Sequence, residues 1–285
     1  MSTIIGLGAA GCNIAKKMDD YPQYKVLYID SEERSEKKFK LIKEQEDHQK
    51  YEENFPSIKT FLKNIKEPCT VIVGGSGKIS GAILRLLQQI PFQVSVLYVK
   101  PDVDLLSELA YKQERLVFQV LQQYTRSGLI KNMFIASNSQ CENILGDLTI
   151  KNYFDRINDL IASTFHMYNV FQNIKPVIQT QAAPQEICKI ATFGLIDGEG
   201  KETLLYDLKF PREKHLYYSI CKKNLETDAS LIKNIKKQVR EQMTEKMKVS
   251  YSVYENNYEQ DYIYSCTYAS MVQEEKYDFP LDDLK

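Results

Sequence analysis

Two glycine-bearing turns, each directly after a short apolar run, constrain the fold of this chain most. The apolar run 3–5 leads into the turn 6–11, and the apolar run 70–73 leads into the turn 74–81. A turn between a buried strand and a helix exposes backbone N–H groups and a helix N-terminus, which together hold a phosphate. Two such turns in one sheet indicate a nucleotide held from two sides.

Strand and helix signals alternate through the first half of the chain, as in a doubly wound parallel sheet. The charged stretch 32–54 reads as a solvated helix and loop. The predicted strands are 3–5, 25–29, 70–73, 93–99 and 132–136, and the predicted helices are 11–20, 56–66, 81–90, 105–126 and 151–173. The sequence therefore predicts an α/β, Rossmann-like nucleotide-binding domain that ends in a long central helix.

The pattern changes after Pro176, where tyrosine-rich strands with little glycine begin. Strands are predicted at 187–196, 203–209, 215–221, 249–255 and 261–269, with a helix at 228–247. This order indicates a smaller α+β domain with a mixed sheet. The predicted domains are a nucleotide-binding domain (1–150), a central helix with the loop after it (151–180), a C-terminal α+β domain (181–273) and an acidic and apolar tail (274–285).

Composition narrows the class of protein. The net charge is −1, so no basic field favours direct binding to nucleic acid, and the apolar stretches are too short for a membrane span. The six cysteines are scattered without a C-x-x-C pair, which indicates buried free thiols in a reducing cytoplasm. The three histidines lie far apart in the sequence, so we expect no metal site built on histidine.

The glycine turns leave two other interpretations open. Gly6, Gly8 and Gly11 with Asp30 fit the dinucleotide fingerprint, in which Asp30 holds a ribose, although the chain offers no evident hydride-transfer residues. The glycines also fit close packing of helix on strand with no ligand at all. A P-loop is excluded by its spacing, because Ile79 stands where the serine or threonine that binds magnesium belongs.

Both turns resemble those of the tubulin/FtsZ superfamily. Residues 6–13 resemble the motif G-x-G-G-G-G-G-N, with Gly6, Gly8, Gly11 and Asn13 at matching positions. Residues 75–81 resemble G-G-G-T-G-[ST]-G, in which the third position and the last two match, whereas Ile79 replaces a glycine. The resemblance implies that GTP or GDP binds here, which Mg²⁺ can accompany. The residues of the two turns that it assigns to this ligand are Gly6, Gly8, Gly11, Cys12, Asn13, Gly75, Ser76, Gly77, Lys78, Ser80 and Gly81.

Further landmarks of the superfamily follow in order. Lys100-Pro101 resembles the loop that holds the ribose, Arg115 follows at the family's spacing, and Glu108 or Glu114 would supply the acid. Asn138 resembles the asparagine of the I-P-N-D segment. Residues 154–160 resemble F-G-A-A-N-D-V, which makes Asn158 and Asp159 readers of the guanine base together with Asn13 and Asn138. A carboxylate that accepts from guanine N1 and the exocyclic amine favours guanine.

The loop that completes catalysis in the family departs from its pattern. Relatives supply acids in an N-x-D-x-x-D motif to the nucleotide of the next subunit, but Gln181 and Pro184 stand at the two acidic positions here. Glutamine holds water but is no base near neutral pH. Glu186 is the nearby carboxylate that a shifted loop would bring in. The sequence thus predicts a GTPase-like protein with slow or absent hydrolysis.

The resemblance also implies head-to-tail self-association into cytoskeletal filaments, in which the segment 173–186 meets the nucleotide face of the next subunit. Compact divergent members of the superfamily occur in phages and plasmids, so a phage or plasmid source and a location in the host cytoplasm are expected. The tail, with Phe279-Pro280-Leu281 between acids, is a candidate peptide for a protein partner. The alternative functions are a non-hydrolysing adaptor with this fold and a dinucleotide-dependent enzyme.

Overall fold

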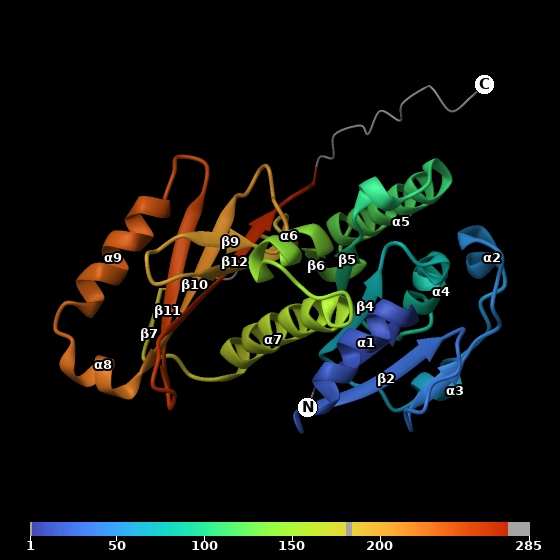
Figure 1. The fold of residues 1–285 in the computed structure, drawn as a ribbon, viewed down its shortest axis with the longest axis horizontal. Helices are drawn as coiled ribbons and strands as arrows, with labels where there is room; N and C mark the ends of the chain where they lie inside the picture. The colour runs from blue at the N-terminus through green and yellow to red at the C-terminus, as the bar shows by residue number, and fades with distance from the viewer. Residues whose placement is uncertain (1, 181–183, 273–285) are drawn as a thin grey trace.

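Both halves of the chain contribute strands to one mixed sheet (Figure 1). The computed structural model describes residues 2–180 and 184–272. The strands of the first half are β1 (Ser2–Leu7), β2 (Tyr24–Asp30), β3 (Phe39–Leu41), β4 (Cys69–Gly74), β5 (Val94–Lys100) and β6 (Ile130–Ser137). Those of the second half are β7 (Ile178–Gln179), β8 (Ile190–Ile196), β9 (Glu202–Leu204), β10 (Glu213–Cys221), β11 (Lys248–Asn256) and β12 (Tyr262–Ala269).

The strand order places the two glycine turns beside each other. Neighbours follow the order β3-β2-β1-β4-β5-β6-β8-β12-β10-β11-β7, and β9 pairs with β8. β1 pairs in parallel with β2 and with β4, so Gly6 lies between Tyr28 and Ile72 in the register. Both turns therefore leave adjacent parallel strands at their carboxyl ends, where α/β sheets bind ligands. The predicted doubly wound arrangement is confirmed.

Helices cover both faces of the sheet. They are α1 (Gly8–Asp19), α2 (His48–Glu53), α3 (Lys59–Leu62), α4 (Ile83–Leu87), α5 (Glu108–Arg126), α6 (Asn138–Leu145), α7 (Tyr153–Asn173), α8 (Lys222–Thr227) and α9 (Leu231–Gln242), with 3₁₀ turns η1 (Lys78–Ala82) and η2 (Val103–Leu105). One apolar cluster joins the sheet to α1 and α7, and a second joins its other face to α2–α5. The long α7 runs between the two halves (Figure 1).

The buried strands explain why their sequences read as continuous apolar runs. On β4, Ile72 packs into the cluster with α1 and α7, whereas Val71 and Val73 pack into the cluster on the opposite face. On β5, Leu97 and Tyr98 divide in the same way. Since successive side chains of a strand point to opposite faces, a strand covered on both sides needs apolar residues at every position.

Short elements differ from the predictions. The stretch 32–54, predicted as a solvated helix and loop, contains β3 as well as α2, whose N-cap Asp47 accepts from the Lys50 amide at 2.8 Å. The predicted helix 56–66 shortens to α3, and the predicted helix 81–90 starts as the 3₁₀ turn η1. The short helices α6 and α8 were not predicted, because fewer than three turns carry little periodicity.

The second half has the predicted mixed sheet. β8 pairs in parallel with β6, through Met133 opposite Ile190, and antiparallel with β12. Strands from both sides of the predicted boundary at 150–181 thus share one sheet, and the domain boundaries stay a prediction. The tail 274–285 lies outside the described residues.

All six cysteines are buried and unpaired, which confirms the predicted free thiols. Burial raises the pKa of Cys12, Cys69, Cys141 and Cys266 to about 12, so these thiols stay neutral. Within residues 2–180 and 184–272, no helix has the length and apolar character that crossing a bilayer requires.

Candidate nucleotide site

The first turn joins β1 to α1 through a glycine in the left-handed region. Gly8 has φ +72°, a conformation that side chains disfavour. The Cys12 Sγ donates to the carbonyl of Gly6 at 3.4 Å, so this predicted site residue points inward and braces the turn. α1 has no side-chain N-cap, which leaves its N-terminus to a ligand or to solvent.

Two glycines of this turn serve close packing. A Cβ added at Gly11 would lie 2.2 Å from the carbonyl oxygen of Ile72 on β4, and one added at Gly6 would lie 2.7 Å from the backbone of Cys12. Glycine is thus required here for α1 to approach the sheet. The packing interpretation holds for these two positions, alongside any ligand that the turn binds.

The second turn lies directly against the first. A Cβ added at Gly74 would lie 2.8 Å from the Ala10 side chain, and one added at Gly8 would lie 2.4 Å from Ile79 Cγ2. Ile79 is buried, and its side chain fills the space over Gly8. The residue that departs from the family's glycine therefore narrows the gap between the two turns.

The predicted residues of the second turn divide into two groups. Ser76, Gly77 and Lys78 are exposed at the start of η1 and are able to meet a ligand. Gly75 and Gly81 are buried: a Cβ at Gly81 would lie 2.1 Å from the carbonyl oxygen of His48 on α2, and one at Gly75 would lie 2.2 Å from the Tyr98 hydroxyl.

Ser80 is fully buried beside these packed glycines. Its hydroxyl has no hydrogen-bond partner within the described ranges. It is thus a buried polar group of the second turn with an unused donor and acceptor, but a ligand reaches it only if the turn moves.

Three of the predicted base-reading residues, Asn13, Asn158 and Asp159, lie on α1 and α7, two helices that contact each other (Figure 1). Nζ of Lys17 lies 2.6 Å from Asp155 Oδ1 and 2.9 Å from Asp159 Oδ1, which ties the two helices. Asn13 lies one helical turn before Lys17 on the same face. Asp159 remains part-exposed, whereas Asn158 is buried.

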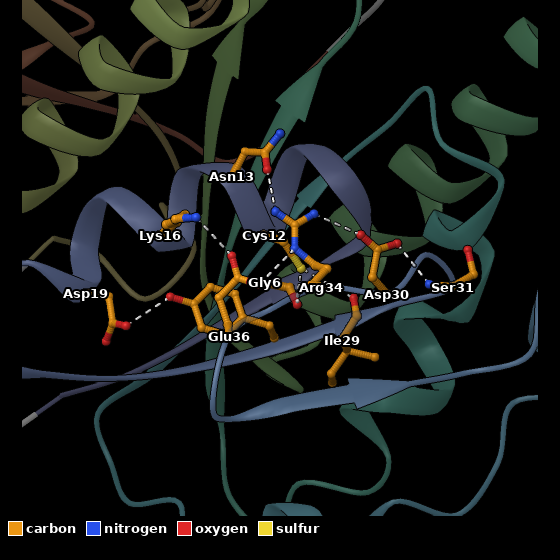
Figure 2. Close-up of polar contacts among 11 residues, drawn as sticks. Gly6, Cys12, Asn13, Lys16, Asp19, Ile29, Asp30, Ser31, Arg34 and Glu36 are labelled. Atoms are coloured by element: carbon orange, nitrogen blue, oxygen red, sulfur yellow. Dashed lines mark hydrogen bonds and ion pairs between the residues drawn. The ribbon is translucent and has the colours of Figure 1, made fainter.

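An arginine that the sequence did not single out holds Asn13. Figure 2 shows the Arg34 guanidinium between Asn13, Asp30 and Glu36. Asp30 is 3% exposed and accepts from Arg34 and from the amide of Ser31 at 2.9 Å. Asp30 is thus occupied by these protein contacts, in contrast to the ribose-holding role that the dinucleotide interpretation gives it.

The two acids that are candidates for holding the ribose lie in different environments. Glu114 is fully buried, lies 3.1 Å from the Nζ of Lys100 and accepts from the Tyr98 hydroxyl at 2.8 Å, so this acid is internal. Glu108 is exposed and pairs with Lys112 along α5. Arg115 is half-buried on α5.

Asn138 lies with the turns at one edge of the sheet. It begins α6 at the carboxyl end of β6, and it is half-buried. β6 is parallel to β5 and β4, so its carboxyl end faces the same edge as the second turn. Its assignment to the base stays a prediction.

The predicted catalytic segment follows α7. β7 pairs with β11, and the Thr180 hydroxyl donates to the carbonyl of Tyr251 at 3.2 Å. Gln181 lies outside the described residues, Pro184 is half-buried, and Glu186 is exposed. Among the described side chains, no group of three or more histidine, cysteine or acidic residues gathers to hold a metal ion.

The whole arrangement is similar to solved structures of filament proteins. An empty FtsZ dimer of M. jannaschii aligns with a TM-score of 0.69 at 12% identity, over 98% of this chain and 94% of that one. GDP-form protofilaments of Bacillus thuringiensis serovar israelensis TubZ give 0.69 at 13%, over 95% and 84%. A GTPγS-bound protofilament of Haloferax volcanii CetZ2 gives 0.65 at 12%, over 94% and 92%.

These alignments establish the fold that the two turns predicted. No family model and no curated protein sequence matches the chain. At 12–13% identity the likeness concerns the fold alone, and it extends over nearly the whole chain.

Proposed function

We propose that this chain, which has the tubulin/FtsZ fold, binds guanine nucleotide at the paired glycine turns and assembles head to tail into filaments. The observation that carries the proposal is the contact between the two turns at one edge of the sheet, beside a helix pair that presents Asn13 and Asp159. Phosphate, base and the family's assembly face would then share one end of the subunit.

The turns suit an anionic ligand. The N-terminus of α1 follows Gly8, and the exposed residues 76–78 add backbone amides and the Lys78 ammonium. Helix N-termini and unhindered amides attract phosphate. Ile79 over Gly8 leaves less room than two open glycine turns would. We therefore expect weaker phosphate binding than a fully glycine-lined cradle gives.

The base site suits guanine through Asp159. Its carboxylate only accepts hydrogen bonds, and guanine presents two donors side by side, N1–H and the exocyclic amine. Adenine lacks this pair. Lys17 holds Asp159 in the free protein at 2.9 Å, and the part-exposed carboxylate still has lone pairs for a base.

Asp159→Asn is expected to lower GTP affinity at least about tenfold, because the amide presents a donor to the guanine donors. Asp155→Asn is the matched control: Asp155 pairs with the same Lys17 but stands one turn away from the base-reading position. We expect it to change affinity less than about twofold. Titration calorimetry with GTP measures both variants. Equal losses would assign the effect to the Lys17 pairs and contradict a base contact.

The assembly proposal draws on the neighbours, which are described as protofilaments and dimers. The nucleotide that copurifies identifies the ligand. Sedimentation with GTP, GDP and a non-hydrolysable analogue then tests assembly. Pelleting that depends on nucleotide supports the proposal, while absence of pelleting with nucleotide bound supports the adaptor alternative.

Slow hydrolysis is expected because Gln181 and Pro184 replace both acids of the catalytic loop. Glu186 is exposed and is the carboxylate that would substitute. Gln181→Asp should raise phosphate release from assembled GTP protein about tenfold or more, since an acid orients and polarises water better than an amide. Glu186→Ala should abolish residual turnover if Glu186 substitutes. Brisk wild-type release that Glu186→Ala leaves intact would contradict this prediction.

A further inference from the structure

Arg34 is half-buried at the edge of the proposed base site, where it makes two hydrogen bonds and one longer ion pair. Its side chain is 15% exposed although the surrounding sequence is strongly charged. Nη2 donates to Asn13 Oδ1 at 2.5 Å, and Nη1 donates to Asp30 Oδ2 at 3.2 Å. Nε lies 3.6 Å from Glu36 Oε2. Figure 2 shows the guanidinium reaching across from the loop after β2 to α1.

The acidic partners of Arg34 are themselves held. Asp30 accepts from the amide of Ser31 at 2.9 Å, and Glu36 lies 3.2 Å from the Nζ of Lys16. Burial alone would raise the pKa of Glu36, but its hydrogen bonds, including that of Lys16, and the charge of Arg34 lower it. Asp30 and Glu36 thus flank the guanidinium, which is a rigid fork of donors.

A guanidinium has no acceptor, so it decides which way the Asn13 amide faces. Oδ1 must point to Arg34, and Nδ2 is turned away from it (Figure 2). Asn13 is exposed and lies one helical turn before Lys17, which pairs with Asp159 of α7, so its NH₂ group presents donors on this exposed side of α1. If Arg34 were replaced, the Asn13 amide would lose the hydrogen bond that orients it and could rotate to present its oxygen instead.

We propose that Arg34 is a positioning residue that makes the site select a 6-oxopurine, by holding Asn13 with its NH₂ group toward O6 of the base. This rests on the proposed binding of guanine nucleotide. Asp159 accepts from N1–H and the exocyclic amine, and O6 is the next atom along the same edge of guanine. Adenine carries a donor amine at that position, and two facing donors exclude each other.

The experiment has one readout in the free protein and one with nucleotide. In protein with ¹⁵N-labelled asparagine, Arg34→Met should shift the side-chain amide resonances of Asn13, which the Asn13→Ala spectrum assigns. In competition binding, Arg34→Met should lower the ratio of GTP to ATP affinity about tenfold. In an Asn13→Ala background, Arg34→Met should change this ratio no further, because Arg34 acts through Asn13.

Lys16→Met is the matched control. Lys16 is a cation of the same cluster whose ion pair is with Glu36, while the hydrogen bond to Asn13 comes from Arg34, so both readouts should change far less than in Arg34→Met. Unchanged Asn13 resonances in Arg34→Met overturn the inference, as does an unchanged GTP to ATP ratio in a variant that binds GTP. A wild-type protein that binds no GTP overturns the proposed function instead, and the amide resonances still decide whether Arg34 orients Asn13.

Discussion

Replacing Gly11 with alanine is expected to destabilise the folded protein by about 3 kcal/mol or more. The added Cβ would lie 2.2 Å from the carbonyl oxygen and 3.0 Å from the carbonyl carbon of Ile72. Both atoms belong to the backbone of β4, which is paired on both sides, so neither can rotate away. Relief requires α1 to lift from the sheet, and α1 carries the buried Ile14 and Met18 of the core.

Urea unfolding of wild type and Gly11→Ala measures this loss. Gly198→Ala is the control, since its added Cβ would meet nothing within 4 Å and its φ is not positive. It should change the free energy of unfolding by less than about 0.5 kcal/mol. A loss below about 1 kcal/mol for Gly11→Ala would mean that α1 has room to move above β4. The first turn would then be a looser ligand cradle than the contacts indicate.

The frame of the site was predictable because its signals are local. A buried strand, a glycine turn and a helix follow one another within about fifteen residues, and each carries its own apolar pattern. The predicted ranges of β1, α1 and β4 therefore lie close to the observed bounds of these elements. The sequence also predicted that both turns belong to one parallel sheet, whereas their direct contact follows from the pairing of β1 with β4 in the structure.

The interior of the site was not predictable, because it depends on contacts between distant segments. Arg34 and Glu36 sit in a stretch whose charges read as solvated, and only packing of the loop after β2 on α1 buries them. The pairing of Lys17 with Asp159 joins residues on two separate helices. In the sequence, Ile79 is only a departure from the glycine pattern of the second turn. The fold shows that its side chain covers Gly8.

These distant contacts give the charged stretch after β2 a function in the proposed site. Asp30 fits a dinucleotide fingerprint in the sequence, yet in the fold it aligns Arg34. The same sequence pattern, a glycine turn followed by Asp30, thus fits either a ribose site or a base site until the partners of Asp30 are known. The partners of Asp30 are protein groups, which favours a base site organised by Arg34 over a ribose site organised by Asp30.

We expect His215 of β10 to make the free energy of unfolding depend strongly on pH. It is 2% exposed, with Nδ1 2.7 Å from the Ser250 hydroxyl and Nε2 3.0 Å from the Ser252 hydroxyl. The ring of Tyr217 packs against the imidazole of His215, with 4.4 Å between the ring centroids. Burial lowers the pKa of His215 from 6.5 to about 3, since the charged ring would lose its hydration.

The sign of the effect follows from proton uptake. Between pH 6.5 and 3 the unfolded chain binds a proton at this histidine and the folded chain does not, so stability falls as the pH falls. Each unit below 6.5 removes about 1.4 kcal/mol, and about 2 kcal/mol is lost between pH 8 and pH 5 from this residue. Burial also lowers the pKa of His48 and His166, which adds to the fall in the same direction.

His215→Gln tests the assignment, because a neutral amide keeps hydrogen bonds to the two serines in reach without titrating. The variant is expected to be less stable than wild type at pH 8 through altered packing, but to lose about 2 kcal/mol less than wild type between pH 8 and pH 5. Urea midpoints at the two pH values give both quantities. His166→Gln, at a half-buried ring, should reduce the pH-dependent loss by a smaller amount. If His215→Gln kept the full wild-type slope, the histidine would have to take up its proton at the same pH in the folded and unfolded chains. The charged ring would then donate to both serine hydroxyls, whereas the neutral ring donates to one and accepts from the other.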